Sequence, residues 1–233
     1  MKVDDAIETI ARYFNDLIGS IVPGLILAVG LTIMHFGPQR IGDVSKSLES
    51  AAVAIVILGL MFASGHALIG IFEVLIQPGL RLSRIVKRFD EASAKQRQSY
   101  VLFVEILSKL QSGNETETRG VWSYNDLRSV ALSISVEGAS LGRRFMFISM
   151  LCNGVGAALL LMAADFIFCM IFDQKLLYSY VEAPNWIAQS ILIFFVAIVL
   201  FKRGEIFYER AMATPFSIAV AELKFKRERN VSE

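Results

Sequence analysis

The stretch LIGSIVPGLILAVGLTIMHF, which covers Leu17–Phe36, contains no Asp, Glu, Lys or Arg. As a helix of about 20 residues it would be about 30 Å long, which is the thickness of the hydrocarbon core of a bilayer. Inside lipid every backbone N–H and C=O group needs a partner within the protein, and a single segment achieves this only as a helix. The stretch therefore predicts a membrane-spanning helix and decides the fold class.

Three further stretches have the same apolar character, namely Ala51–Ile76, Phe145–Phe172 and the shorter Trp186–Phe201. The chain of 233 residues is 55% hydrophobic, carries 19% charged residues and has a mean hydropathy of +0.54. Soluble domains contain about 25% charged residues. We therefore expect an all-α integral membrane protein with four transmembrane helices and a cytoplasmic helical hairpin between spans two and three.

The distribution of basic residues predicts the orientation of these spans. All but three of the 23 Lys and Arg residues lie in the N-terminal arm, between spans two and three, or in the C-terminal tail. The exceptions are Arg40, Lys46 and Lys175. Because cytoplasmic segments of membrane proteins carry an excess of Lys and Arg, both termini and the middle segment are expected in the cytoplasm.

The predicted spans divide the chain into four parts. These are an N-terminal arm with spans one and two (1–77), the cytoplasmic hairpin (78–144), spans three and four (145–203), and a C-terminal helix with a basic tail (204–233). The hairpin is expected to open with an amphipathic helix, whose apolar positions are Leu80, Leu82, Ile85, Val86 and Phe89. A second helix is expected to begin near Ser123, which forms a capping-box pattern with Asp126 and could continue into span three.

Four polar residues fall within or near the apolar spans. Glu73 and Asp165 lie near span ends, where water can reach them. His66 and Asn153 lie deeper, at a similar height of roughly 12–15 Å from the inner surface, so a hydrogen bond between spans two and three is possible. Intramembrane polar groups are costly, and the two residues could serve as structural contacts, as part of an ion path or as subunit contacts.

Small residues recur at four-residue spacing in two of the spans. Gly59, Ala63 and Ala67 form such a row in span two, and Gly154 and Ala158 form one in span three. Rows of small residues let two helices approach closely. The rows indicate either oligomerisation or packing within one bundle, and the sequence leaves both open.

A basic cluster follows span two and consists of Arg81, Arg84, Lys87 and Arg88. Lys and Arg near the inner leaflet attract anionic lipid by about 1 kcal/mol each. The cluster therefore indicates contact with an anionic inner leaflet, or docking of a cytoplasmic protein partner.

The sequence contains no recognisable catalytic, cofactor or metal-binding motif. His35 lies at the outer end of span one with no evident partner, and the two cysteines, Cys152 and Cys169, lie in one apolar stretch without metal-binding spacing. The net charge of +1 gives no basis for nucleic-acid binding. We therefore expect neither an enzyme nor a cofactor.

The layout of the whole chain resembles that of small four-span membrane proteins of bacterial anti-phage defence operons, such as the membrane component of the Kiwa system. The similarity lies in the short inner arm, Val22-Pro23-Gly24 early in span one, the long inner segment and the charged inner tail. It implies an oligomeric sensor or scaffold of the bacterial inner membrane that relays an envelope event to a cytoplasmic partner. The alternative function is an oligomeric channel or pore-forming effector that depolarises the membrane.

Overall fold

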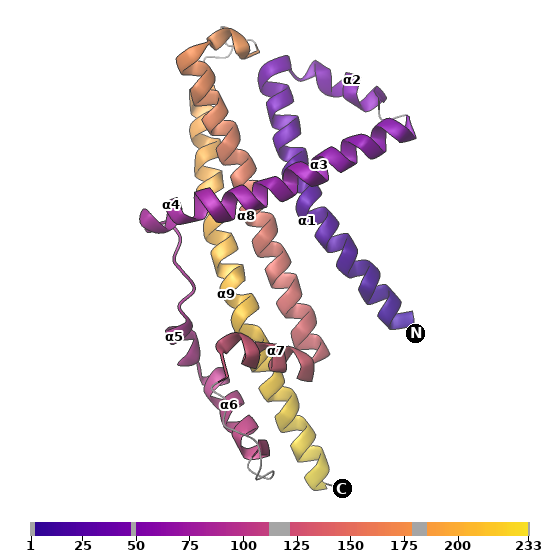
Figure 1. The fold of residues 1–233 in the computed structure, drawn as a ribbon, viewed down its shortest axis with the longest axis vertical. Helices are drawn as coiled ribbons and strands as arrows, with labels where there is room; N and C mark the ends of the chain where they lie inside the picture. Colours follow the sequence, from indigo (N-terminus) through magenta and orange to yellow (C-terminus); the bar gives the residue numbers. More distant parts are fainter. Residues whose placement is uncertain (1–2, 48–49, 112–121, 179–185, 233) are drawn as a thin grey trace. The chain divides into compact units, whose positions relative to one another are not determined.

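The computed structural model describes residues 3–47, 50–111, 122–178 and 186–232, and within these ranges all regular secondary structure is helical (Figure 1). The elements in chain order are α1 (Val3–Phe36), α2 (Gln39–Ser47), α3 (Ala51–Ile71), the π-helix η1 (Phe72–Ile76), α4 (Gln77–Leu82), α5 (Glu91–Lys95), α6 (Gln98–Gln111), α7 (Tyr124–Ile134), α8 (Val136–Phe172), the 3-10 helix η2 (Gln174–Leu176) and α9 (Trp186–Ser232).

Three helices in the described ranges are long and apolar enough to cross a membrane. They are Leu17–Phe36 within α1, the continuous Ala51–Leu82 formed by α3, η1 and α4, and Val136–Phe172, which is α8. The expectation of four such helices is therefore wrong by one. The fourth stretch, Trp186–Phe201, is helical but opens the 47-residue helix α9. Its apolar part is shorter than the about 20 residues that a span needs, because Lys202 follows it directly.

The chain forms two compact units. The apolar unit consists of Met1–Lys87 and Phe147–Glu205, and the aromatic unit consists of Arg88–Met146 and Ile206–Glu233. The sequence treats the middle segment and the C-terminal tail as separate parts, whereas in the structure they share one core. Both α8 and α9 contribute residues to both units.

The apolar unit contains a close crossing of α3 over α1 (Figure 1). A Cβ atom at Gly65 would overlap the carbonyl oxygen of Ser20, and one at Gly24 would overlap the carbonyl oxygen of Met61. Because the neighbouring atoms belong to backbone, neither helix can make room by turning a side chain. The two glycines therefore set the distance between α1 and α3.

A second contact in the apolar unit joins the helical segment that includes η1 to α9. The ring of Phe72 stacks on that of Phe201 with centroids 5.2 Å apart, and both side chains are buried. Ala157 and Ala158 of α8 and Ala197 of α9 belong to the same cluster. Small residues on α8 and α9 thus leave room for the two phenylalanine rings.

The aromatic unit is packed around rings supplied by α6, α7 and α9. Tyr100 stacks on Tyr124 with centroids 5.5 Å apart, and Phe216 meets both rings edge-on. Phe103 completes the cluster and is fully buried. Aromatic pairs in such geometries contribute about 0.5–1.5 kcal/mol beyond the area they bury, so this cluster is the core of the unit.

Of the two helices expected in the hairpin, the structure contradicts most of the first and confirms the start of the second. The predicted helix over residues 80–89 is wrong beyond Leu82, because Arg84 adopts a φ of 58° and the amides of Ile85 and Val86 turn back to the carbonyl of Leu80. The predicted start at Ser123 is confirmed, since Ser123 and Asp126 form a complete capping box. The helix does not continue into α8, because Ser135 is extended and ends α7.

Candidate functional site

His35 of α1 and two residues of α8, Asp165 and Cys169, form a cluster of three potential metal ligands. The Nε2 atom of His35 lies 2.8 Å from Oδ2 of Asp165. Asp165 and Cys169 are four residues apart, so they lie on the same face of α8. One ligand atom from each of the three residues lies within 4.8 Å of the others.

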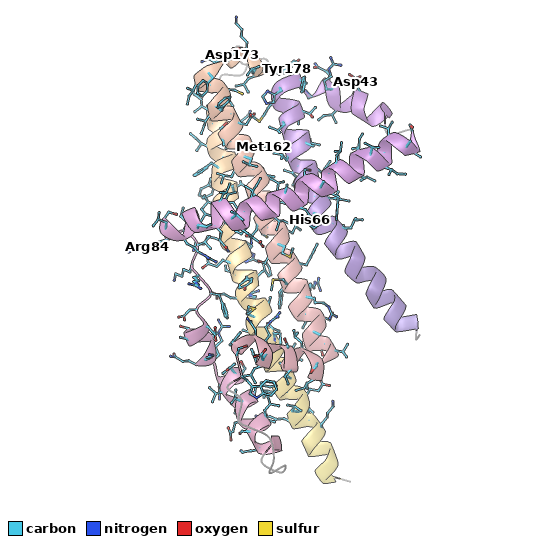
Figure 2. All side chains as sticks on the ribbon, viewed as in Figure 1. Asp43, His66, Arg84, Met162, Asp173 and Tyr178 are labelled. Carbon is cyan, nitrogen blue, oxygen red and sulfur yellow. The ribbon has the colours of Figure 1, made fainter. Side chains whose placement is uncertain are left out.

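The segment after α8 folds back over the end of α1 and closes the cluster. The carbonyl oxygen of Leu176 lies 3.0 Å from Nδ1 of His35. The amide of Tyr178, labelled in Figure 2, donates to the carbonyl of Met34, and its hydroxyl donates to Oε1 of Gln39. Gly37 sits against the Tyr178 ring with a φ of 85°, a conformation that favours glycine. The backbone thus fixes both the position and the orientation of the imidazole.

Apolar side chains surround the sulfur end of the cluster. Cys169 is 1% exposed and packs with Met34, Met162, Phe166 and Leu177. Met162, labelled in Figure 2, lies against the space left by Gly30 of α1. The cluster is therefore polar and partly exposed at the His35–Asp165 pair and dry at the thiol.

The expectation that His35 has no partner is wrong, and the expectation for Asp165 missed a direct contact. His35 and Asp165 are 130 positions apart, and no local sequence pattern predicts that they meet. The only available signal was the four-residue spacing of Asp165 and Cys169 in one apolar helix.

The hydrogen bond that the sequence makes possible between His66 and Asn153 is not formed. Nε2 of His66 lies 3.4 Å from the hydroxyl of Ser20, at the crossing of α3 and α1 (Figure 2), and the ring packs edge-on against Phe62. The carbonyl oxygen of the Asn153 side chain is buried without a hydrogen-bond partner and lies against Gly204 of α9. Equal depth therefore did not imply contact, because the two residues face different helices.

The remaining intramembrane candidate, Glu73, is exposed on η1. One turn before Asn153, the hydroxyl of Ser149 donates to the carbonyl of Gly204 at 2.8 Å. The polar contact between α8 and α9 is thus made by Ser149, which the sequence did not single out.

The two rows of small residues lie in different surroundings. Gly154 and Ala158 are buried within the chain, and Gly154 lies against Pro23 of α1. Gly59, Ala63 and Ala67 are exposed on α3, and nothing lies within 4 Å of a Cβ atom built at Gly59. One row therefore serves packing within the chain, whereas the other is open.

The predicted lipid or partner contacts are all exposed, namely Arg81, Arg84, Lys87 and Arg88. They surround the bend that follows α4. The backbone amide of Lys87 donates to Oε1 of Glu205 at 2.9 Å, and Lys202 pairs with the same carboxylate. Glu205 therefore holds this bend against α9 while the four basic side chains stay accessible.

A proline in α9 leaves one backbone carbonyl without its helical donor, and α7 supplies donors to that carbonyl and to the next one. Pro215 lies inside α9 and has no N–H group to donate to the carbonyl of Ala211. Nε and Nη2 of Arg128 each lie 3.3 Å from that oxygen, and the hydroxyl of Tyr124 donates to the next carbonyl, of Met212. Burial raises the pKa of Tyr124 to about 12 and lowers the pKa of Arg128. We call this arrangement the Pro215 clamp.

Comparison with protein-family models gives no match, and comparisons with curated proteins and with solved structures give no significant match.

Proposed function

We propose that this chain is an oligomeric sensor or scaffold of the bacterial inner membrane, which relays an event at the envelope to a cytoplasmic partner. The proposal places its role in anti-phage defence, as the resemblance of the layout implies. The observation that carries it is the continuity of two helices. Helix α8 begins in the aromatic unit and ends in the apolar unit, and α9 begins in the apolar unit and ends in the aromatic unit. Neither helix is interrupted between the two units.

The start of α9 is proposed to lie in the membrane beside the three long apolar helices. Large apolar side chains are exposed along that segment: Ile187, Ile191, Leu192, Phe194, Phe195 and Val199. Exposure of a contiguous apolar surface to water is unfavourable by about 25 cal/mol per Å², whereas lipid removes this cost.

The exposed row on α3 supports a homo-oligomer. Gly59, Ala63 and Ala67 are all exposed, and small residues at this spacing suit a helix from a second copy. Exposed apolar neighbours such as Ile55 and Leu60 add surface that either lipid or a second copy can cover.

The partner contact is proposed at the basic bend formed by Arg81, Arg84, Lys87 and Arg88. These side chains are exposed at the end of α4, where an anionic leaflet or an acidic protein surface would be attracted. The experiment is native mass spectrometry of the protein extracted gently from its own membrane. A symmetric oligomer that carries a soluble protein is the expected result.

The docking site is tested by charge reversal in the same preparation. Replacing Arg84, Lys87 and Arg88 with Glu should release the soluble partner, and replacing Lys109, Lys224 and Lys226 with Glu is the control with equal charge change. Retention of the partner by the first variant would remove the basic bend from the proposal. A bare monomer would contradict the whole proposal, and an oligomer without a partner that conducts ions would favour the channel alternative.

A further inference from the structure

We propose that His35, Asp165 and Cys169 bind one divalent transition-metal ion, with Zn²⁺ as the best fit. Their ligand atoms lie within 4.8 Å of one another and offer one nitrogen, one oxygen and one sulfur. Zn²⁺ accepts this mixed set, whereas Mg²⁺ and Ca²⁺ bind through oxygen atoms. The inference stands on this geometry alone, and it holds whether or not the chain is a sensor.

The orientation of the His35 ring decides which of its two nitrogen atoms can bind a metal ion. Nδ1 lies 3.0 Å from the carbonyl oxygen of Leu176, which can only accept a hydrogen bond, so Nδ1 holds the proton. Nε2, which lies 2.8 Å from Oδ2 of Asp165, then carries either a proton or a lone pair that is open to a ligand. Two acceptors at this distance repel each other unless a cation lies between them, and that cation is either a proton or a metal ion.

The same orientation is typical of histidines that bind metals. Such a histidine donates its second N–H to a backbone carbonyl or a carboxylate, which fixes the tautomer and turns the free lone pair to the ion. The Leu176 carbonyl has this role for His35. Leu177, which follows it, is buried in the same apolar cluster as Cys169, so the carbonyl is held in place by packing.

Cys169 is the observation that favours a metal ion over a shared proton. A proton between His35 and Asp165 requires no third group, yet the thiol lies within reach on the same face of α8. Its apolar neighbours, among them Met34 and Phe166, keep water from the sulfur side. A soft sulfur ligand in a dry surrounding is a feature of sites for zinc and related ions.

Binding of the ion balances the charges of the site. The ion replaces the proton between Nε2 and Oδ2 and displaces the thiol proton of Cys169, so its charge is matched by one carboxylate and one thiolate. The Nε2–Oδ2 distance would open from 2.8 Å to about 3.3 Å, as tetrahedral coordination requires. Three protein ligands leave the fourth position of a tetrahedral ion for water.

The test uses Co²⁺ as a spectroscopic probe for the full-length protein in detergent, after treatment with a chelator. Cobalt bound to a thiolate gives a charge-transfer band in the near ultraviolet. We expect one Co²⁺ per chain, displacement of the band by Zn²⁺, and a higher unfolding temperature with either metal. Cys169→Ser should lose the band, and Asp165→Asn should weaken binding at least about tenfold.

Cys152→Ser is the matched control, because it removes the other thiol of α8 and leaves the cluster intact. This variant should keep the band and the metal-dependent rise in unfolding temperature. Asp165→Asn retains an oxygen for His35, so it tests the site even if Cys169→Ser fails to fold. Absence of the band from the wild type, or loss of the band in Cys152→Ser alone, would overturn the proposal and leave His35 and Asp165 as a pair that shares a proton.

Discussion

The apolar unit and the aromatic unit are both built from helices, but different forces position those helices. In the apolar unit, α1 and α3 are held at backbone distance by Gly24 and Gly65, and many large apolar side chains point outward. In the aromatic unit, stacked rings form a core, and ion pairs such as Arg97–Glu209 lie on the surface. The first pattern is the one expected of helices in lipid, and the second is the one expected of helices in water.

The two units are vulnerable to different substitutions. In the proposed lipid surrounding no hydrophobic force draws helices together, so the apolar unit depends on close packing, and an added methyl group at a crossing is harmful. The aromatic unit depends on burying rings and on satisfying the polar groups near them, so it is vulnerable to the loss of a hydrogen-bond donor.

The largest effect is expected from Gly65→Ala in the apolar unit. Its Cβ atom would overlap the Ser20 carbonyl, so α1 and α3 must separate, at a cost of about 3 kcal/mol. Gly70→Ala is the control on the same helix, because its Cβ atom meets nothing within 4 Å and Gly70 lies outside the row proposed to contact a second copy. The measurement is the unfolding temperature of each variant in detergent. Equal unfolding temperatures for the two variants would contradict a close crossing at Gly65.

A smaller effect is expected from Arg128→Leu in the aromatic unit. The change leaves the Ala211 carbonyl without a donor and should destabilise the protein by about 2 kcal/mol. Pro215→Ala would restore an N–H group at that position, so the loss should shrink when both changes are combined. A double-mutant cycle measures this coupling, and strictly additive effects would show that Arg128 does not compensate for Pro215.

The smallest effect at neutral pH concerns the titration of Tyr124. Burial raises its pKa from near 10 to about 12, so the folded protein holds the phenolic proton more tightly than the unfolded chain does. The resulting stabilisation is complete below about pH 10 and is lost as the pH rises towards about 12. Unfolding measured at about pH 9 and about pH 11 should show a steeper loss for the wild type than for Tyr124→Phe. An equal loss in both would mean that Tyr124 does not titrate differently on folding.

Local signals in the sequence predicted the parts of the fold that depend on a few consecutive residues. The first long apolar helix follows from a stretch of 20 residues without a charged Asp, Glu, Lys or Arg, and the start of α7 follows from the Ser123–Asp126 box. The end of α4 was missed because Arg84 takes a positive φ without the glycine that usually signals it. The count of spans was wrong because α9 joins a short apolar segment to a long polar helix.

The candidate site was less predictable than the fold. His35 meets Asp165 across 130 positions, and Arg128 meets the Ala211 carbonyl across 83. Such contacts depend on which faces of two helices pack together. A row of polar or small residues in the sequence does not specify which helix its face will meet. The exposure of the Gly59 row and the burial of the Gly154 row illustrate the same limit, since both rows look alike in sequence.

The π-helix η1 has a consequence for the length of the helical segment that contains α3. Leu68 and Leu80 belong to the same buried cluster, yet residues twelve apart in a regular α-helix point about 120° away from each other. With one residue fewer between them the difference would be about 20°. The wide turn at Phe72–Ile76 absorbs the surplus residue, as an insertion would require. A chain shortened by one residue within η1 should therefore form an ordinary α-helix there and keep both ends of the segment in register.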